Sequence, residues 1–194
     1  LTHGLRLARE TMRTNDGVRL EGGYDFSYSW QRKIVNRTIG YWGRLMVTAG
    51  AGVDATVGFR YHAQNSNNPA QAEAAVCFTP AMAADWRFFL VSPKNGRRHA
   101  LGVRYEAAVP LAGMMFSPAF GQSYYEIFSR GDYDHNLCPV WAGNALSVRQ
   151  RLLFTFKLLG KPLFIGYEAD IRQAHVNDIK YHRYTHAAVA GWQW

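Results

Sequence analysis

The sequence has no stretch approaching the roughly 18 uncharged apolar residues that a membrane-spanning helix needs, which excludes a helical membrane protein. It also lacks linkers, low-complexity tracts and internal repeats, so its 194 residues are expected to form one domain, 1–194. Acidic residues are scarce, with 14 Asp and Glu against 22 Lys and Arg, and the formal net charge is +8. The mean hydropathy of -0.24 is also compatible with a transmembrane β-barrel, in which only alternate residues are apolar.

Aromatic residues, in contrast, are abundant. Six Trp, eleven Tyr and eleven Phe make up 14% of the chain. Tyr and Trp are favoured where one end of a side chain is apolar and the other is in water, as at a membrane interface. The aromatic content therefore points to a membrane.

Alternation with a period of two residues is the main pattern. Tyr24, Phe26, Tyr28 and Trp30 share one face of a predicted strand, and Asp25, Ser27 and Ser29 share the other. Segments 101–109, 146–158 and 163–172 likewise place charges on one face and apolar residues on the other. The apolar faces run for about 9–11 residues, the length with which a tilted strand crosses a bilayer. We therefore expect polar residues inside and apolar residues outside, the polarity of an outer-membrane barrel.

This pattern predicts an all-β fold, a small antiparallel transmembrane β-barrel of about eight strands. The strands are expected at 2–12, 18–31, 40–64, 70–91, 98–110, 145–158, 161–174 and 181–194. Turn signals at 14–17, 93–96 and 159–162 separate strands. Gly50, Gly52, Gly58 and Pro80 are interpreted as bends or bulges in the third and fourth strands, and splitting those strands gives a ten-stranded alternative.

One connection, 111–144, is long and rich in aromatic residues, and we expect it to be an ordered extracellular loop over the barrel mouth. Within it, 115–118 and the motif GQSYYEIF at 121–128 resemble an uncharacterised family of Bacteroidota outer-membrane β-barrels, a domain of unknown function. The resemblance continues through 143–149 and 166–171. It implies a fold and a location in the outer membrane of a Gram-negative bacterium, but no activity. The loop residues expected to contact partners are Tyr124, Tyr125, Glu126, Phe128, Asp132 and Tyr133.

The sharpest candidate for catalysis is His62 with Ser66, near the end of the third predicted strand. A His that activates a Ser hydroxyl, oriented by Glu73 or Asp54, would suit a hydrolase that removes acyl chains from lipid A. No dedicated motif accompanies these residues, and a polar loop explains them more simply. The enzyme is therefore an alternative, and no catalytic residue is assigned.

Two other groups of residues are candidates, one for a metal site and one for a disulfide. Asp132, Asp134 and His135 could offer ligands to a divalent cation, but the spacing matches no ligand signature, so no metal or cofactor is expected. Cys77 and Cys138 are the only cysteines, and in an exported protein they could form a disulfide. The sequence leaves open whether they do.

The inward charges are expected to pair and fill the lumen, because an eight-stranded barrel has room only for side chains. The basic residues are spread over the alternating strands without a clustered patch, which argues against nucleic acid. Lipopolysaccharide, phospholipid and other outer-membrane proteins are the expected partners. The function predicted is a non-enzymatic structural or accessory subunit of an outer-membrane complex for assembly, secretion or transport. A lipid A-modifying hydrolase and a small channel are the alternatives.

Overall fold

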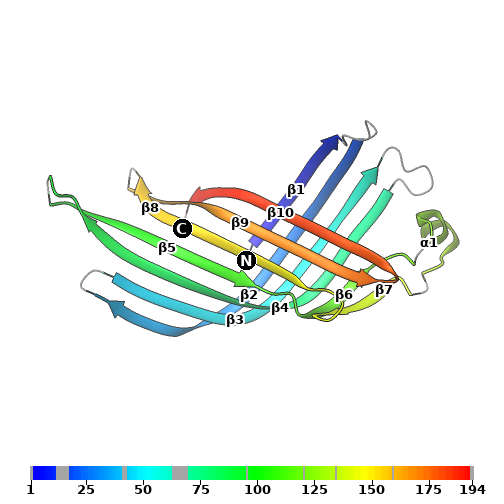
Figure 1. Cartoon of the computed structure of the whole chain (residues 1–194), viewed down its shortest axis with the longest axis horizontal. Helices are drawn as coiled ribbons and strands as arrows, with labels where there is room; N and C mark the ends of the chain where they lie inside the picture. The colour runs from blue at the N-terminus through cyan, green and yellow to red at the C-terminus, as the bar shows by residue number, and fades with distance from the viewer. Residues whose placement is uncertain are drawn as a thin grey trace.

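The described residues form one antiparallel sheet with a single short helix, as a computed structural model shows (Figure 1). The structure describes residues 2–11 (backbone alone), 18–40, 43–62, 70–94, 96–119, 121–133, 135–158 and 160–192. The ten strands are β1 Thr2–Thr11, β2 Val18–Ile39, β3 Gly43–His62, β4 Ala70–Val91, β5 Arg98–Ala108, β6 Ala112–Phe116, β7 Leu137–Trp141, β8 Ser147–Leu158, β9 Lys161–Val176 and β10 Ile179–Trp192. The helix α1 spans Tyr124–Arg130 and has seven residues. No helix in these ranges is long and apolar enough to cross a membrane.

All eight expected strands are present and pair in chain order, β1-β2-β3-β4-β5-β8-β9-β10. β2 runs eight residues further than expected, to Ile39. A bulge between Lys33 and Val35 shifts the alternation of its side chains, so the two-residue pattern did not predict the second part of this strand. The register of β3 against β4 continues without a shift through the glycines and Pro80, so no bulge interrupts this pair of strands. Both strands are continuous, and the ten-stranded alternative obtained by splitting them is wrong.

The two additional strands come from the segment expected as a loop. β6 pairs with β4 and β7 pairs with β6, so both extend the wall of the sheet beyond β5 and β8. The break between β5 and β6 lies where Pro80 faces the segment that contains Pro110, with Val109 N donating to Pro80 O at 3.0 Å. Two prolines at this point remove ladder donors, which is a physical reason for the break. The connection without strands is therefore 117–136.

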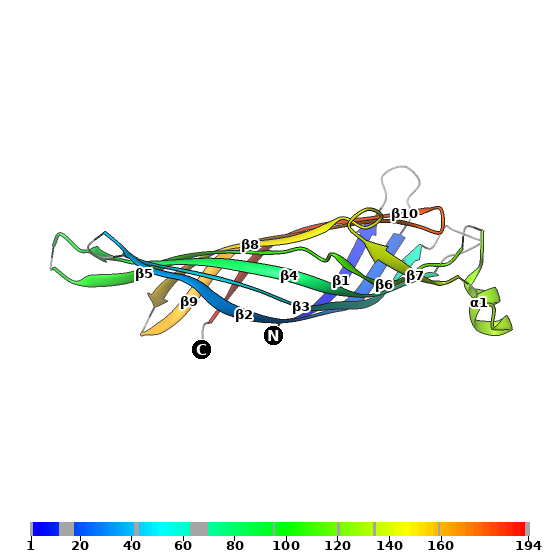
Figure 2. The same cartoon turned by 90° about the horizontal axis from the view of Figure 1, so that it is seen from below.

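The sheet curls but does not close. β8, β9 and β10 lie over β2, β3 and β4 in both views (Figures 1 and 2). Within the described ranges, however, no pairing joins β1 to β10, which are the two ends of the strand order. The closed barrel expected from the sequence is therefore corrected to an open, curled sheet.

The polarity of the two faces is the inverted one that the alternation predicts. On the convex face Tyr24, Tyr28 and Trp30 are 41%, 52% and 57% exposed. On the concave face Ser27 and Asp54 are buried, at 9% and 6% exposed. The interior of the curled sheet is thus polar and its outside apolar.

Antiparallel alternation gives the sheet two different ends. The connections 40–42, 92–97 and 159–160 lie at one end, which we call the turn end and which is on the left in Figure 1. The connection 117–136 with α1, and the β9–β10 turn at Asn177 and Asp178, lie at the other, the loop end. At the turn end, Gly96 and Gly160 adopt positive φ angles of 63° and 80°, which confirms the turns expected there.

Candidate functional site

The concave face carries a continuous set of charged side chains, and this charged interior is the candidate site. Each side chain comes from an alternate position of its strand, so the two-residue period of the sequence places it inside. Asp54, Glu73, Asp85 and Arg183 are all at most 6% exposed. Buried charges are costly unless they are paired, so their partners decide what the site can do.

Two arginines occupy the part of the interior nearest the loop end. Arg172 on β9 lies directly opposite Arg183 on β10 in the register. The adjacent like charges are compensated by three carboxylates: Arg183 binds Glu73 at 2.7 Å and Asp170 at 3.4 Å, and Arg172 binds Asp25 at 3.4 Å. Arg183 also approaches Asp25 at 3.5 Å. These pairs connect β9 and β10 with β2 and β4 across the interior.

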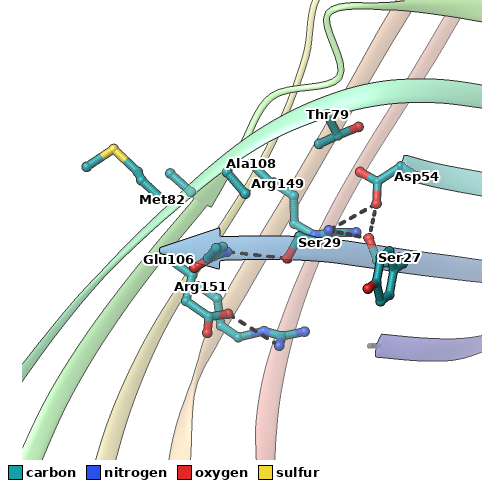
Figure 3. A pocket seen from close by; sticks show the side chains of 13 residues that line it. Ser27, Ser29, Asp54, Thr79, Met82, Glu106, Ala108, Arg149 and Arg151 are labelled. Carbon is teal, nitrogen blue, oxygen red and sulfur yellow. Dashed lines mark hydrogen bonds and ion pairs between the residues drawn. The ribbon is translucent and has the colours of Figure 1, made fainter. Parts of the chain in front are cut away.

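A second cluster borders a cavity of about 270 Å³ nearer the turn end (Figure 3). Here the Ser27 hydroxyl donates to Asp54, and Arg149 donates to Ser27 Oγ at 2.5 Å and to Asp54 Oδ1 at 3.2 Å. Arg151 lies beside this group and pairs with Glu106 at 3.5 Å and with Glu168. The cavity is therefore lined by charges that already have partners.

Two glycines on β3 lie close to the backbone of β2. Gly50 and Gly52 occupy inward positions of β3, and a Cβ at Gly52 would lie 1.8 Å from the carbonyl oxygen of Tyr28. A side chain at Gly50 would similarly meet Trp30 O at 1.9 Å. The close approach of β2 and β3 thus requires glycine at these two positions.

The arrangement does not resemble an activated nucleophile. A serine becomes nucleophilic when a neighbouring base takes its proton, and that base is usually a histidine. Ser27 instead donates to Asp54, a carboxylate that is itself paired with Arg149, and accepts from Arg149, which cannot take a proton. The three groups form a charge-neutralising hydrogen-bond network.

The structure describes three of the four residues proposed for a hydrolase. His62 lies at the end of β3, opposite Arg19 on β2. Glu73 binds Arg183, and Tyr181 also approaches it. Asp54 binds Ser27 and Arg149. Ser66 lies outside the described residues, so the hydrolase set stays a prediction.

The connection 117–136 is ordered around α1. Ser123 and Glu126 form a capping box in which each side chain accepts from the other's backbone N–H, and Gly131 ends the helix with a positive φ of 71°. The sequence reasoning missed this helix, although S-Y-Y-E followed by Gly131 is its signature. Hydrogen bonds to Ser123 hold the pKa of the Glu126 carboxyl below its usual value.

Two sets of hydrogen bonds fix this connection to the sheet. The Tyr124 hydroxyl accepts from Ala72 N at 2.7 Å and so reaches β4, and burial raises the pKa of this phenol. In the β9–β10 turn, Asn177 donates to His135 O at 2.8 Å and to Ser117 O at 3.0 Å. The connection is therefore docked at both of its ends.

The predicted loop residues then divide by exposure. Tyr124 stacks on Phe128, with ring centroids 5.9 Å apart, and Phe128 meets Tyr133 edge to face. Tyr125, Phe128 and Tyr133 are 66%, 59% and 58% exposed, so each presents a ring to the surroundings. We call these three residues the aromatic loop patch. Glu126 acts in the helix cap, and Asp132 N donates to its carbonyl oxygen at 3.2 Å.

The cysteines and the metal candidates give no site. Cys77 and Cys138 are both free. They lie on β4 and β7, with β6 between them, and two strand spacings amount to about 9.6 Å, beyond the Cα separation of a disulfide. In the described part of the chain no three His, Cys, Asp or Glu residues gather as a metal site, and Asp134 lies outside that part.

Comparison with known proteins gives a family. The family described as "Protein of unknown function (DUF3316)" matches residues 2–193, nearly the whole chain, and the chain belongs to it. No curated protein and no solved structure matches the chain.

Proposed function

We propose that this member of the DUF3316 family is an integral outer-membrane protein of a Gram-negative, Bacteroidota-like bacterium, a barrel whose convex face contacts phospholipid and lipopolysaccharide. Its role is non-enzymatic, as a structural or accessory subunit of an outer-membrane complex for assembly, secretion or transport. The observation that carries the proposal is the polarity: charged residues are buried, and large apolar residues cover the outside.

The exposed apolar residues favour lipid over water. On β3, Val57 and Phe59 are 57% and 54% exposed, and on β4, Val76 and Phe78 are 54% and 53% exposed. Apolar surface costs about 25 cal/mol per Å² in water, and monomeric soluble proteins rarely expose a contiguous patch above a few hundred Å². A bilayer removes this cost. Paired charges inside and apolar residues outside suit such a surrounding.

The open edges lead to a further part of the proposal. Unpaired backbone groups cost several kcal/mol each in the hydrocarbon core, so sheets cross membranes as closed barrels. We infer that β1 and β10 pair with each other in the membrane and complete an eight-stranded wall.

The aromatic loop patch supports the role of a subunit. A capped helix, hydrogen bonds to β4 and to the β9–β10 turn, and three exposed rings together make a rigid projecting surface. Tyr and Phe are enriched where proteins bind other proteins. The ion pairs across the interior argue against the channel alternative. The hydrogen bond that Arg149 donates to Ser27 argues against a nucleophilic serine, and so against the hydrolase.

Two experiments test the proposal. Fractionation of native membranes, with a gel shift between unheated and boiled samples, tests for a folded barrel in the outer membrane; a soluble chain without the shift would contradict it.

Affinity purification from native outer membranes in mild detergent tests the subunit role. We expect co-purifying proteins that the triple substitution Tyr125→Ser, Phe128→Ser, Tyr133→Ser removes. As the control, Tyr105→Ser on the outer wall retains them. Recovery of the chain alone would count against a subunit role.

A further inference from the structure

The turn end carries most of the net positive charge of the protein. The basic residues there are all exposed, and we call them the basic turn-end surface: Arg37, Arg44, Arg87, Lys94, Arg97, Arg98, Lys157 and Lys161. They lie on β2, β3, β4, β5, β8 and β9 and on their connections. In the sequence these residues look dispersed, but the antiparallel fold brings them to one end of the sheet (Figure 1).

Acidic residues are nearly absent from this end. The sequence has none between Asp25 and Asp54, and none between Arg151 and Glu168. Asp85 is the acidic side chain nearest the surface; it is 5% exposed and is paired with Arg87 at 2.9 Å and Arg104 at 3.6 Å. Basic residues therefore outnumber acidic ones at this surface, which gives it a positive potential.

Apolar side chains are interleaved with these charges. Ile34 and Ile39 on β2 are 62% and 48% exposed, and Phe89, Leu90 and Val91 on β4 are 47%, 55% and 48% exposed. A surface for nucleic acid is basic and polar, with rings for stacking rather than aliphatic side chains. Basic residues together with exposed aliphatic and aromatic residues are typical of surfaces that lie at the headgroups of an anionic membrane.

A cavity of about 260 Å³ opens among these residues. Arg87, Arg104 and Lys157 contribute cations to it, and Phe88, Phe89 and Phe156 contribute rings. Asp85 also lines it and pairs with both arginines. The exposed tryptophans Trp86 and Trp192 lie toward the same end, where they pair with Val103 on β5 and Leu163 on β9. Cations next to apolar walls match a phosphate headgroup with the first part of its acyl chain.

We propose that the basic turn-end surface binds anionic phospholipid headgroups of the leaflet at that end, with the cavity between β4, β5 and β8 as a headgroup site. This rests on the proposed membrane insertion. The lipid anchors the projecting hairpins β2–β3 and β4–β5 against the leaflet and fixes the depth of the sheet.

Quenching by brominated lipids tests the proposal, because Trp86 and Trp192 lie near this end. The protein is reconstituted into phosphatidylcholine vesicles that contain brominated phosphatidylglycerol or, in parallel, brominated phosphatidylcholine. We expect phosphatidylglycerol to quench preferentially, with a relative association constant several-fold above one that falls as salt is added. Arg37→Gln with Lys94→Gln should reduce this constant about two- to fivefold for each charge removed. The matched control Arg130→Gln with Lys180→Gln, two exposed basic residues at the loop end, should leave it unchanged.

The outcomes separate the two proposals. Equal quenching by both lipids, or equal losses in both double variants, would overturn the lipid site and leave membrane insertion standing. Absence of quenching by either lipid would overturn insertion itself. A competition experiment uses the detergent-solubilised protein with bound phosphatidylglycerol. Displacement of this lipid by micromolar single-stranded DNA or inorganic phosphate would show a general anion-binding surface, and would also overturn the lipid site.

Discussion

Arg183 on β10 donates to Glu73 on β4 at 2.7 Å, and both side chains are 6% exposed. The two strands are not neighbours in the sheet, so this pair holds opposite walls together across the interior. It is also the clearest case of a charge that the alternation of the sequence sends inward and the fold then neutralises.

Glu73→Gln should strongly destabilise the protein, because it leaves Arg183 without its closest carboxylate in a buried position. We expect a loss of about 3–5 kcal/mol in the free energy of unfolding, measured by urea titration in detergent micelles. Glu106→Gln is the control, since Glu106 is 30% exposed and its pairs with Arg104 and Arg151 are partly screened. Its loss should be about 1 kcal/mol or less. Equal losses in the two variants would contradict the role given to Arg183 and Glu73.

Gly52→Ala should also destabilise the sheet, by about 1–3 kcal/mol, because its Cβ would lie 1.8 Å from Tyr28 O and would push β2 and β3 apart. Gly102→Ala is the matched control on β5. The nearest atom to its new Cβ would lie at 3.6 Å, so we expect a change within about 0.5 kcal/mol. The same urea titrations measure both, and a tolerated Gly52→Ala would show that the strands are further apart than described.

The interior pairs should block ion flow. Arg172 binds Asp25 and Arg183 binds Glu73, so side chains from β9 and β10 reach β2 and β4 across the lumen. In planar bilayers we expect the reconstituted protein to give no stable unitary conductance. Reproducible single-channel steps would contradict the filled interior and favour the channel alternative.

The stability of helix α1 should depend on pH. The pKa of Glu126 in the folded protein lies below the usual 4.5, because Ser123 hydrogen-bonds its carboxylate. Its contribution to stability is therefore full above that usual value and is lost as the pH falls through the folded-state pKa. Hydrogen exchange of residues 124–130 should accelerate over that range. Glu126→Gln should remove most of this pH dependence, whereas Asp132→Asn, outside the cap, should retain it; an unchanged profile in Glu126→Gln would refute the cap.

Both thiols should be free. Cys77 and Cys138 are separated by β6, so they should each take up an alkylating reagent when the purified protein is denatured without reductant. Intact mass spectrometry would show two adducts. A protein that is alkylated only after reduction would show that β4 and β7 come closer than the strand order allows.

Much of the fold could be read from the sequence, because a two-residue period requires no knowledge of distant contacts. The eight strand ranges and the inward charges follow from it directly. The end of β2 could not be predicted, since the bulge at Lys33 breaks the period, and the open edge between β1 and β10 depends on curvature that no local pattern encodes. The basic turn-end surface could not be predicted from the sequence, because its residues come together only when the antiparallel strands place their turns at one end of the sheet.

The most direct test of the central claim, an apolar outer face in contact with lipid, is spin-label accessibility along β3. Nitroxides are introduced one at a time at Val53, Thr56 and Val57, in a Cys77→Ala, Cys138→Ala background, with Lys94 as the aqueous control. We predict that labels at Val53 and Val57 collide mostly with oxygen, which concentrates in lipid, that Thr56 is protected from both reagents, and that Lys94 is accessible to a water-soluble nickel chelate. Labels at Val53 and Val57 that collide with the nickel chelate as strongly as Lys94 does would contradict the account.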